Sequence, residues 1–149
     1  MSDFIRLNIA RENDGSGQLF LEFGADGFSG SGAAYFDLAL LADRAREFAA
    51  YPLPIDAPVL LAGGFLDKGD FSRLRQEHLH VSAYPLGGSG RIGLMLKVAE
   101  PADDGRQDVL RRSASAEFLV NYDLLSRFSK GLVELATGKC EDFMLEMPG

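Results

Sequence analysis

Hydrophobic and polar residues alternate through most of this chain, and the alternation gives way to a helical period in two places. Apolar side chains recur at every second position from Phe4 to Ala10 and again from Gln18 to Phe23. The stretch Asn13–Gly17 between them is rich in turn-forming residues. The two runs therefore predict a β-hairpin, and a third strand is expected over Phe28–Phe36.

Two later segments carry apolar residues at helical spacing. Asp37 is a predicted N-cap for the first, and Asn121 or Asp123 for the second, while Gly138 suits the end of the second. The similarity of the two apolar stripes suggests a duplicated unit of strands followed by a helix. The stripes are Leu38, Leu41, Ala45 and Phe48 in the first helix, and Leu125, Phe128, Leu132 and Leu135 in the second.

The remaining strands are predicted over Val59–Phe65, within the hairpin Arg75–Val98, over Asp108–Leu119 and over Cys140–Met147. The expected order is βββ-α-ββββ-α-β. Short links between successive strands favour antiparallel neighbours. We expect an α+β fold with one curved, mainly antiparallel sheet of about seven to eight strands and both helices on one face. The length of 149 residues suits a single domain.

The hairpin Arg75–Val98 has a register that can be predicted from its apolar residues. Pairing Tyr84 with Gly93 places Ala83 opposite Leu94, and it also brings the other large apolar partners to the same side. The aromatic ring of Tyr84 would then cover the strand glycine. The same register sets His80 opposite Lys97, on the side away from the helices.

The polar side of this hairpin and of the next strand forms one candidate recognition surface. The mixture of aromatic, basic and small polar side chains is typical of such surfaces, although the solvated side of an ordinary antiparallel sheet has a similar composition. The candidate binding residues are His78, His80, Ser82, Tyr84, Lys97, Arg111, Ser113 and Glu117, and Met95 and Ser115 are expected on the same face.

His78 and His80, the two histidines of the chain, are the first place to look for chemistry. A His-x-His strand can bind zinc, but zinc needs at least a third protein ligand, and no spacing marks one. Lys97 beside His80 would oppose a bound cation. We therefore predict no metal, no cofactor and no catalytic residue, and keep general acid–base catalysis by His78 and His80 as the alternative.

The glycine-rich stretch Gly27–Gly32 resembles a phosphate-binding loop only superficially. Such a loop follows a strand and opens directly into a helix, whereas these glycines lie within a predicted strand. Gly30 and Gly32 instead indicate that another segment approaches the strand closely.

Composition limits the partners. Lys and Arg number 15 against 22 Asp and Glu, which gives a net charge of −7 and disfavours nucleic acid and anionic membrane surfaces. The single cysteine, Cys140, cannot form an internal disulfide, which favours a reducing compartment. No secretory leader or membrane-spanning run is recognisable, so a cytoplasmic location is expected.

The overall pattern resembles that of small bacterial α+β families, some of which are similar to immunity proteins of polymorphic toxin systems. The matching pieces are Phe28–Gly30, Leu41–Phe48, Gly90–Gly93 and Leu125–Leu135. The resemblance implies a protein partner, and an acidic chain would suit a basic toxin. The leading hypothesis is a non-enzymatic protein-binding module, and the resemblance implies an immunity-like role for it. A small metal-dependent or acid–base enzyme is the alternative, and a homodimer through an exposed sheet edge or face is also considered.

Overall fold

The computed structural model describes residues 3–102 and 112–147, and it has the predicted α+β class and order of elements. The elements are β1 (Phe4–Arg11), β2 (Ser16–Ala25), β3 (Phe28–Asp37), α1 (Leu38–Glu47), β4 (Val59–Asp67), β5 (Asp70–Pro85), β6 (Ile92–Ala99), β7 (Ser113–Val120), α2 (Tyr122–Thr137) and β8 (Asp142–Glu146). The part of the predicted strand Asp108–Leu119 that precedes Arg112 lies outside the described residues.

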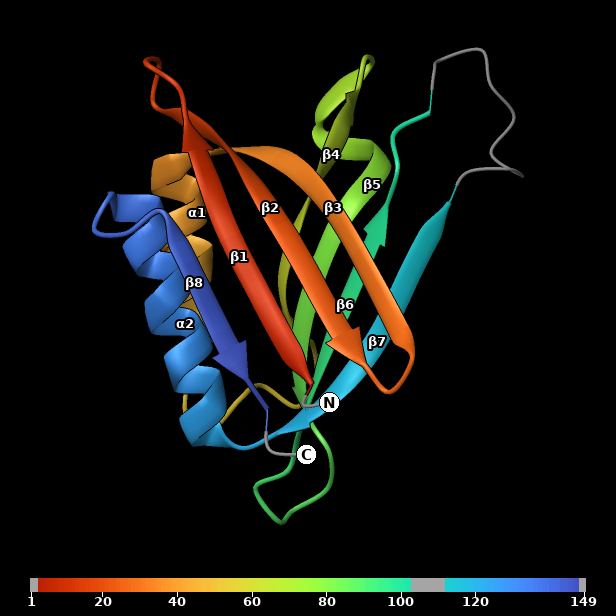
Figure 1. Ribbon diagram of the computed structural model, residues 1–149, viewed down its shortest axis with the longest axis vertical. Coiled ribbons are helices and arrows are strands. Elements are labelled where there is room, and N and C mark those ends of the chain that lie inside the picture. Colours follow the sequence, from red (N-terminus) through yellow and green to blue (C-terminus); the bar gives the residue numbers. More distant parts are fainter. Residues whose placement is uncertain (1–2, 103–111, 148–149) are drawn as a thin grey trace.

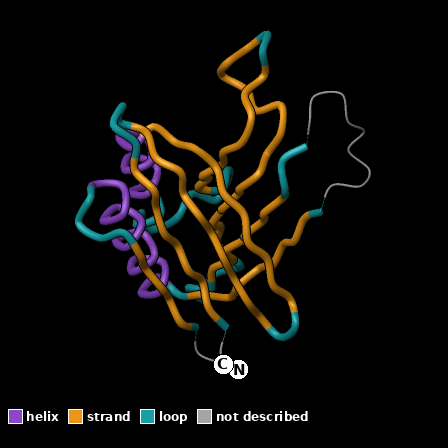
Figure 2. Tube along the Cα trace, turned by 45° about the horizontal axis from the view of Figure 1, so that its top comes forward, coloured by secondary structure: helices purple, strands orange, loops and turns teal. Residues whose placement is uncertain are grey.

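The strands divide into two antiparallel sheets of four, whereas the sequence indicated one continuous sheet. Sheet A has the order β3-β2-β1-β8 and sheet B the order β4-β5-β6-β7. In Figure 1, sheet A lies in front of sheet B, and both helices lie together at one side, next to β8. Figure 2 shows the same separation of the two sheets from a second direction. Large apolar side chains of both sheets and both helices form one buried core.

Both helices begin and pack as their sequences predict. The side chain of Asp37 caps α1 by accepting from the Leu40 N–H at 2.9 Å, and Asn121 caps α2 by accepting from the Leu124 N–H at 2.8 Å. Gly138 ends α2 in the left-handed conformation. All eight residues of the two predicted stripes are buried, so the stripes are the faces that each helix turns toward the core.

The order of strands in the two sheets reveals a repeated unit. The unit β-β-β-α-β occurs twice, first as β1–β4 with α1 and then as β5–β8 with α2. Each unit contributes its last strand to the edge of the other unit's sheet, since β4 pairs with β5 and β8 pairs with β1. This exchange ties the two halves of the chain together.

Close packing between the sheets depends on small residues in β3. A Cβ atom on Gly30 would lie 2.8 Å from the Cβ of Ala114, and one on Gly32 would lie 2.8 Å from the Cβ of Val98. Real Cβ atoms do not approach so closely, so these two positions let β3 cross sheet B at short range. The expected close approach at Gly30 and Gly32 is confirmed.

Candidate functional site

The predicted register of the β5–β6 hairpin is confirmed. Ala83 pairs with Leu94, Tyr84 with Gly93 and His80 with Lys97. The ring of Tyr84 covers Gly93 so closely that a side chain at position 93 would collide with it. The register sorts the strands into an inner face, which carries the apolar residues of the core, and an outer face that neither helix covers.

The outer face of sheet B brings together most of the predicted binding residues. His80, Ser82 and Tyr84 come from β5 and Lys97 comes from β6, while β7 contributes the residues that follow Arg112. Cross-strand pairing places Lys97 next to Ser115 and Met95 next to Glu117. The residues that this face combines are His80, Ser82, Tyr84, Met95, Lys97, Ser113, Ser115 and Glu117; Arg111 lies outside the described residues.

Tyr84 and Glu117 form a polar contact between β5 and β7 on this face. The Tyr84 hydroxyl reaches over Gly93 of the intervening strand and donates a hydrogen bond to the Glu117 carboxylate. Burial, together with this hydrogen bond and the negative charge of Glu117, raises the pKa of Tyr84 to about 12. Tyr84 is therefore held as a neutral donor through the physiological range and is no candidate base.

His80 interacts with neighbours on its own strand. Its Nε2 lies 3.2 Å from the Ser82 hydroxyl oxygen, in hydrogen-bonding geometry. Its Nδ1 lies 3.2 Å from a carboxylate oxygen of Glu77 but makes no hydrogen bond with it. Lys97 is exposed, and among the described residues no carboxylate lies within ion-pair distance of it. In the described part of this face, His80 and Tyr84 therefore interact with neighbouring side chains, whereas Lys97 forms no ion pair.

His78 does not belong to the outer face, and its prediction as a binding residue there was wrong. The side chain is only 3% exposed, and its ring packs edge-on against Phe65, with the centroids 4.5 Å apart. The cause is a bulge: Gly63 pairs with Leu79 and Gly64 with Glu77, so His78 is an extra residue in β5. Because a bulge breaks the alternation of the strand, His78 turns toward the core while His80 faces outward.

A buried amide satisfies the polar atoms around His78. Gln76 Oε1 lies 2.9 Å from His78 Nε2 and also accepts from the Ala102 N–H at 3.1 Å. Its Nε2 donates to the Ala102 carbonyl at 2.7 Å. Gln76 therefore anchors the chain after β6 to the inner side of β5, and its cluster with His78 is a structural network of buried polar groups.

The histidines consequently share no site, since they lie on opposite sides of sheet B. Among residues 3–102 and 112–147, no group of three histidine, cysteine or acidic side chains is arranged to hold a metal ion. Cys140 is half-buried and has no disulfide partner.

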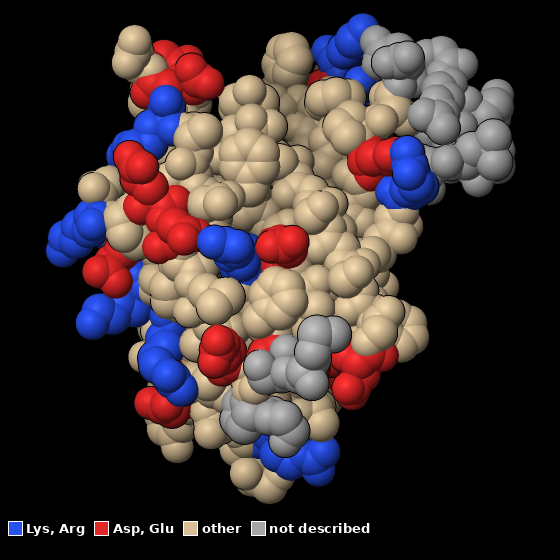
Figure 3. All heavy atoms as spheres, in the orientation of Figure 1, with Lys and Arg blue, Asp and Glu red and all other residues tan. Residues whose placement is uncertain are grey.

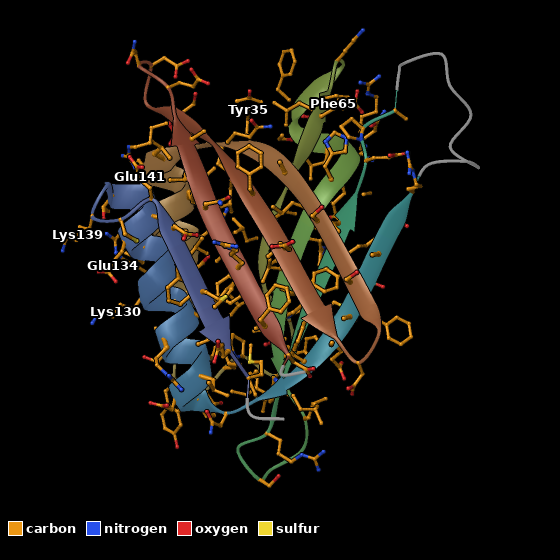
Figure 4. The ribbon with its side chains drawn as sticks, in the orientation of Figure 1. Tyr35, Phe65, Lys130, Glu134, Lys139 and Glu141 are labelled. Atoms are coloured by element: carbon orange, nitrogen blue, oxygen red, sulfur yellow. The ribbon has the colours of Figure 1, made fainter. Side chains whose placement is uncertain are left out.

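The outer face of sheet A is a second surface that no described helix or strand covers, and it was not predicted from the sequence. Tyr35 is 59% exposed, Phe20 is 40% exposed and Met144 is 51% exposed. Figure 3 shows much of this face as uncharged, with neighbouring basic and acidic side chains near its centre and the most charged side chains, of both signs, on the α2 and β8 side. Figure 4 labels four of these charged residues, Lys130, Glu134, Lys139 and Glu141, and shows Tyr35 on β3.

Small residues beside Phe20 make a shallow hollow in the sheet A face. The hollow has a volume of about 400 Å³ and lies between Phe20, Glu22 and Arg6. Its floor includes Gly32 and Ala33, whose small size leaves the space open. The sequence did hold a signal for this surface, because Phe20 stands on the polar side of its strand, between Gln18 and Glu22.

Comparison of the chain with protein-family models, with curated proteins and with solved structures finds no match. In the described residues, neither helix is long and apolar enough to cross a membrane.

Proposed function

We propose that this protein is a non-enzymatic protein-binding module whose partner docks on the outer face of sheet A. The observation that carries the proposal is the exposure of Tyr35, Phe20 and Met144 on a sheet face that no described helix or strand covers. Aromatic residues and methionine are enriched in the centres of protein interfaces. Tyrosine loses little conformational entropy on binding and is frequent among the residues that dominate affinity.

The charge around this face selects a basic partner. Glu22, Asp142 and Glu146 outnumber Arg6 on the outward side of sheet A, and the Arg6 guanidinium already lies 3.5 Å from the Asp142 carboxylate. The whole chain carries a net charge of −7. A basic protein would therefore be attracted by the net charge of the chain and by the carboxylates on this face, and it would meet the aromatic anchors there. A basic toxin, as in an immunity pair, is one partner with this chemistry.

The outer face of sheet B supports docking less well than that of sheet A. Tyr84 donates to Glu117, and His80 already contacts Ser82 and Glu77. A partner would have to replace interactions that these side chains already make. Leu60 and Leu119 are the large apolar residues exposed there, and they provide matched positions for a control variant.

The test compares two double variants of the full chain. Immobilised wild-type protein, F20A/Y35A and L60A/L119A are exposed to a lysate of the source cells, and each retained protein is then purified and titrated in a calorimeter. The proposal expects a basic protein that binds wild type and L60A/L119A at one-to-one stoichiometry. Its affinity should fall by about a hundredfold or more for F20A/Y35A, which corresponds to the loss of two interface anchors.

The binding of this partner should also weaken as salt concentration rises, because the net negative charge of the chain contributes to association. The proposal fails if no protein binds in a manner that depends on Phe20 and Tyr35, or if the L60A/L119A variant loses the partner instead. Sedimentation of the purified chain supplies a separate outcome. If the chain forms a homodimer that dissociates on F20A/Y35A substitution, the molecule that docks on sheet A is a second copy of the chain and not a basic partner.

A further inference from the structure

Two loop regions and the start of α2 meet at the lower end of the molecule in Figure 1. The connector between α1 and β4, the loop between β5 and β6, and the start of α2 line a pocket of about 580 Å³. Concave, largely apolar pockets of this size are typical of small-molecule sites. The pocket shares no residue with the proposed docking face, because none of its lining residues belongs to β1, β2, β3 or β8.

The apolar wall of this pocket is built around two tyrosines. The rings of Tyr51 and Tyr122 meet edge-on, with their centroids 4.7 Å apart. Tyr122 is fixed by its hydroxyl, which accepts from the Leu53 N–H at 3.1 Å and retains its own proton for donation. Pro52 and Pro85 complete the wall. This wall presents flat apolar surface together with the hydroxyl groups of both tyrosines.

Two of the lining residues are unusually exposed for their type. Tyr51 is 79% exposed and Ile55 is 93% exposed, although both are large and apolar. They flank a concave space, so a ligand that entered it would cover both side chains and remove apolar surface from water.

Arg91 gives the pocket its charge selectivity. Its side chain is exposed at the pocket, and among the described residues it forms no ion pair and contacts no acidic lining residue. An unpaired guanidinium beside an apolar wall favours a ligand that has a flat apolar body and a carboxylate, because the planar fork matches the two carboxylate oxygens. We propose that this pocket binds a small aromatic carboxylate, with its ring against Tyr51 and Tyr122 and its carboxylate on Arg91.

The probes are 2-naphthoate and its neutral counterpart 2-naphthamide, titrated into the isotope-labelled full chain and followed by amide NMR shifts. We expect saturable shifts for naphthoate at Leu53, Gly88 and Arg91, and an affinity for naphthamide about tenfold lower. R91Q should lower the naphthoate affinity to that of naphthamide and leave naphthamide binding unchanged. Y51A should weaken both probes.

The matched control is R44Q, which removes an exposed arginine that lies on α1 and pairs with Glu47. This variant should bind both probes like wild type. The proposal is overturned if naphthoate causes no saturable shifts at the pocket, if the acid and the amide bind equally, or if R44Q reduces naphthoate binding as much as R91Q does. Because the readout is confined to this pocket, the result is independent of partner binding on sheet A.

Discussion

His78 and His80 are separated by a single residue on β5, yet their imidazoles lie on opposite sides of sheet B. His78 contacts Phe65 and Gln76 on the inner side, and His80 contacts Ser82 and Glu77 on the outer side. The bulge between the pairs Gly63–Leu79 and Gly64–Glu77 causes this separation. The bulge also explains why the side chain of Glu77, three positions before His80, lies on the outer face together with His80.

Substitution of Gly64 tests the structural importance of this bulge. A Cβ atom at position 64 would collide with the backbone carbonyl oxygen of Gln76. No side-chain rotation can relieve a clash with backbone, so G64A should lower the free energy of unfolding by about 1–3 kcal/mol. Urea denaturation measures the change. G88A is the matched control, because its Cβ would meet open space, and it should change stability by less than about 0.5 kcal/mol. Equal stability of the two variants would show that the bulge adjusts freely.

The buried amide of Gln76 is the second element of this network that can be tested. Replacement by alanine removes the hydrogen bonds that Gln76 makes with the N–H and C=O of Ala102 and its contact with His78 Nε2. Since unsatisfied buried groups are costly, Q76A should lower the free energy of unfolding by about 2–3 kcal/mol. Q18A, on the outer side of sheet A, should cost less than about 0.5 kcal/mol. Denaturation curves of the two variants compare them directly, and similar losses would contradict a special role for Gln76.

Features that depend on local pattern could be predicted from the sequence. The pairing of Ala83 with Leu94 follows from alternation and from the position of the turn, because a slip of one residue would expose every apolar partner. The caps at Asp37 and Asn121 likewise depend on short-range chemistry. Local rules also identified Gly30 and Gly32 as points of close approach.

Features that depend on distant segments could not be predicted in the same way. The division into two sheets results from the pairing of β4 with β5 and of β8 with β1, and alternation within a strand does not specify its neighbour. The bulge at His78 depends on the register of β4 against β5. The pocket at Arg91 is lined by two loops and the start of α2, which are far apart in the sequence, so no spacing along the chain indicates it.

Gly131 and Phe143 form a contact that sets the distance between α2 and β8. A Cβ atom on Gly131 would lie 2.5 Å from the ring of Phe143. Alanine favours a helix over glycine by about 1 kcal/mol, but the displacement of the ring should outweigh this gain. G131A should therefore destabilise the protein by up to about 2 kcal/mol in thermal or urea denaturation.

The effect of G131A on stability should have the opposite sign once the ring of Phe143 has been removed. In the F143A background, G131A should stabilise the protein by up to about 1 kcal/mol, because only the helix propensity remains. A double-mutant cycle of the four proteins measures this coupling. Additive effects of the two substitutions would mean that the ring does not control the helix–strand distance.

The contact between Tyr84 and Glu117 predicts a loss of stability at alkaline pH. Burial and the neighbouring carboxylate raise the pKa of Tyr84 from 10.0 to about 12, so the folded protein keeps a proton that the unfolded chain releases. The resulting stabilisation is complete below pH 10 and declines as the pH rises through about 12. Y84F should abolish this part of the pH dependence, as measured by urea denaturation across the range.

Ultraviolet titration of tyrosinate, with Y84F used to assign the signal by difference, checks the raised pKa itself. E117Q should lower the pKa of Tyr84 toward its ordinary value of 10.0 without reaching it, because burial, the larger cause, remains. A wild-type titration in which Tyr84 ionises together with the other tyrosines, or an unchanged Tyr84 pKa in E117Q, would contradict the contact as the second cause of the shift.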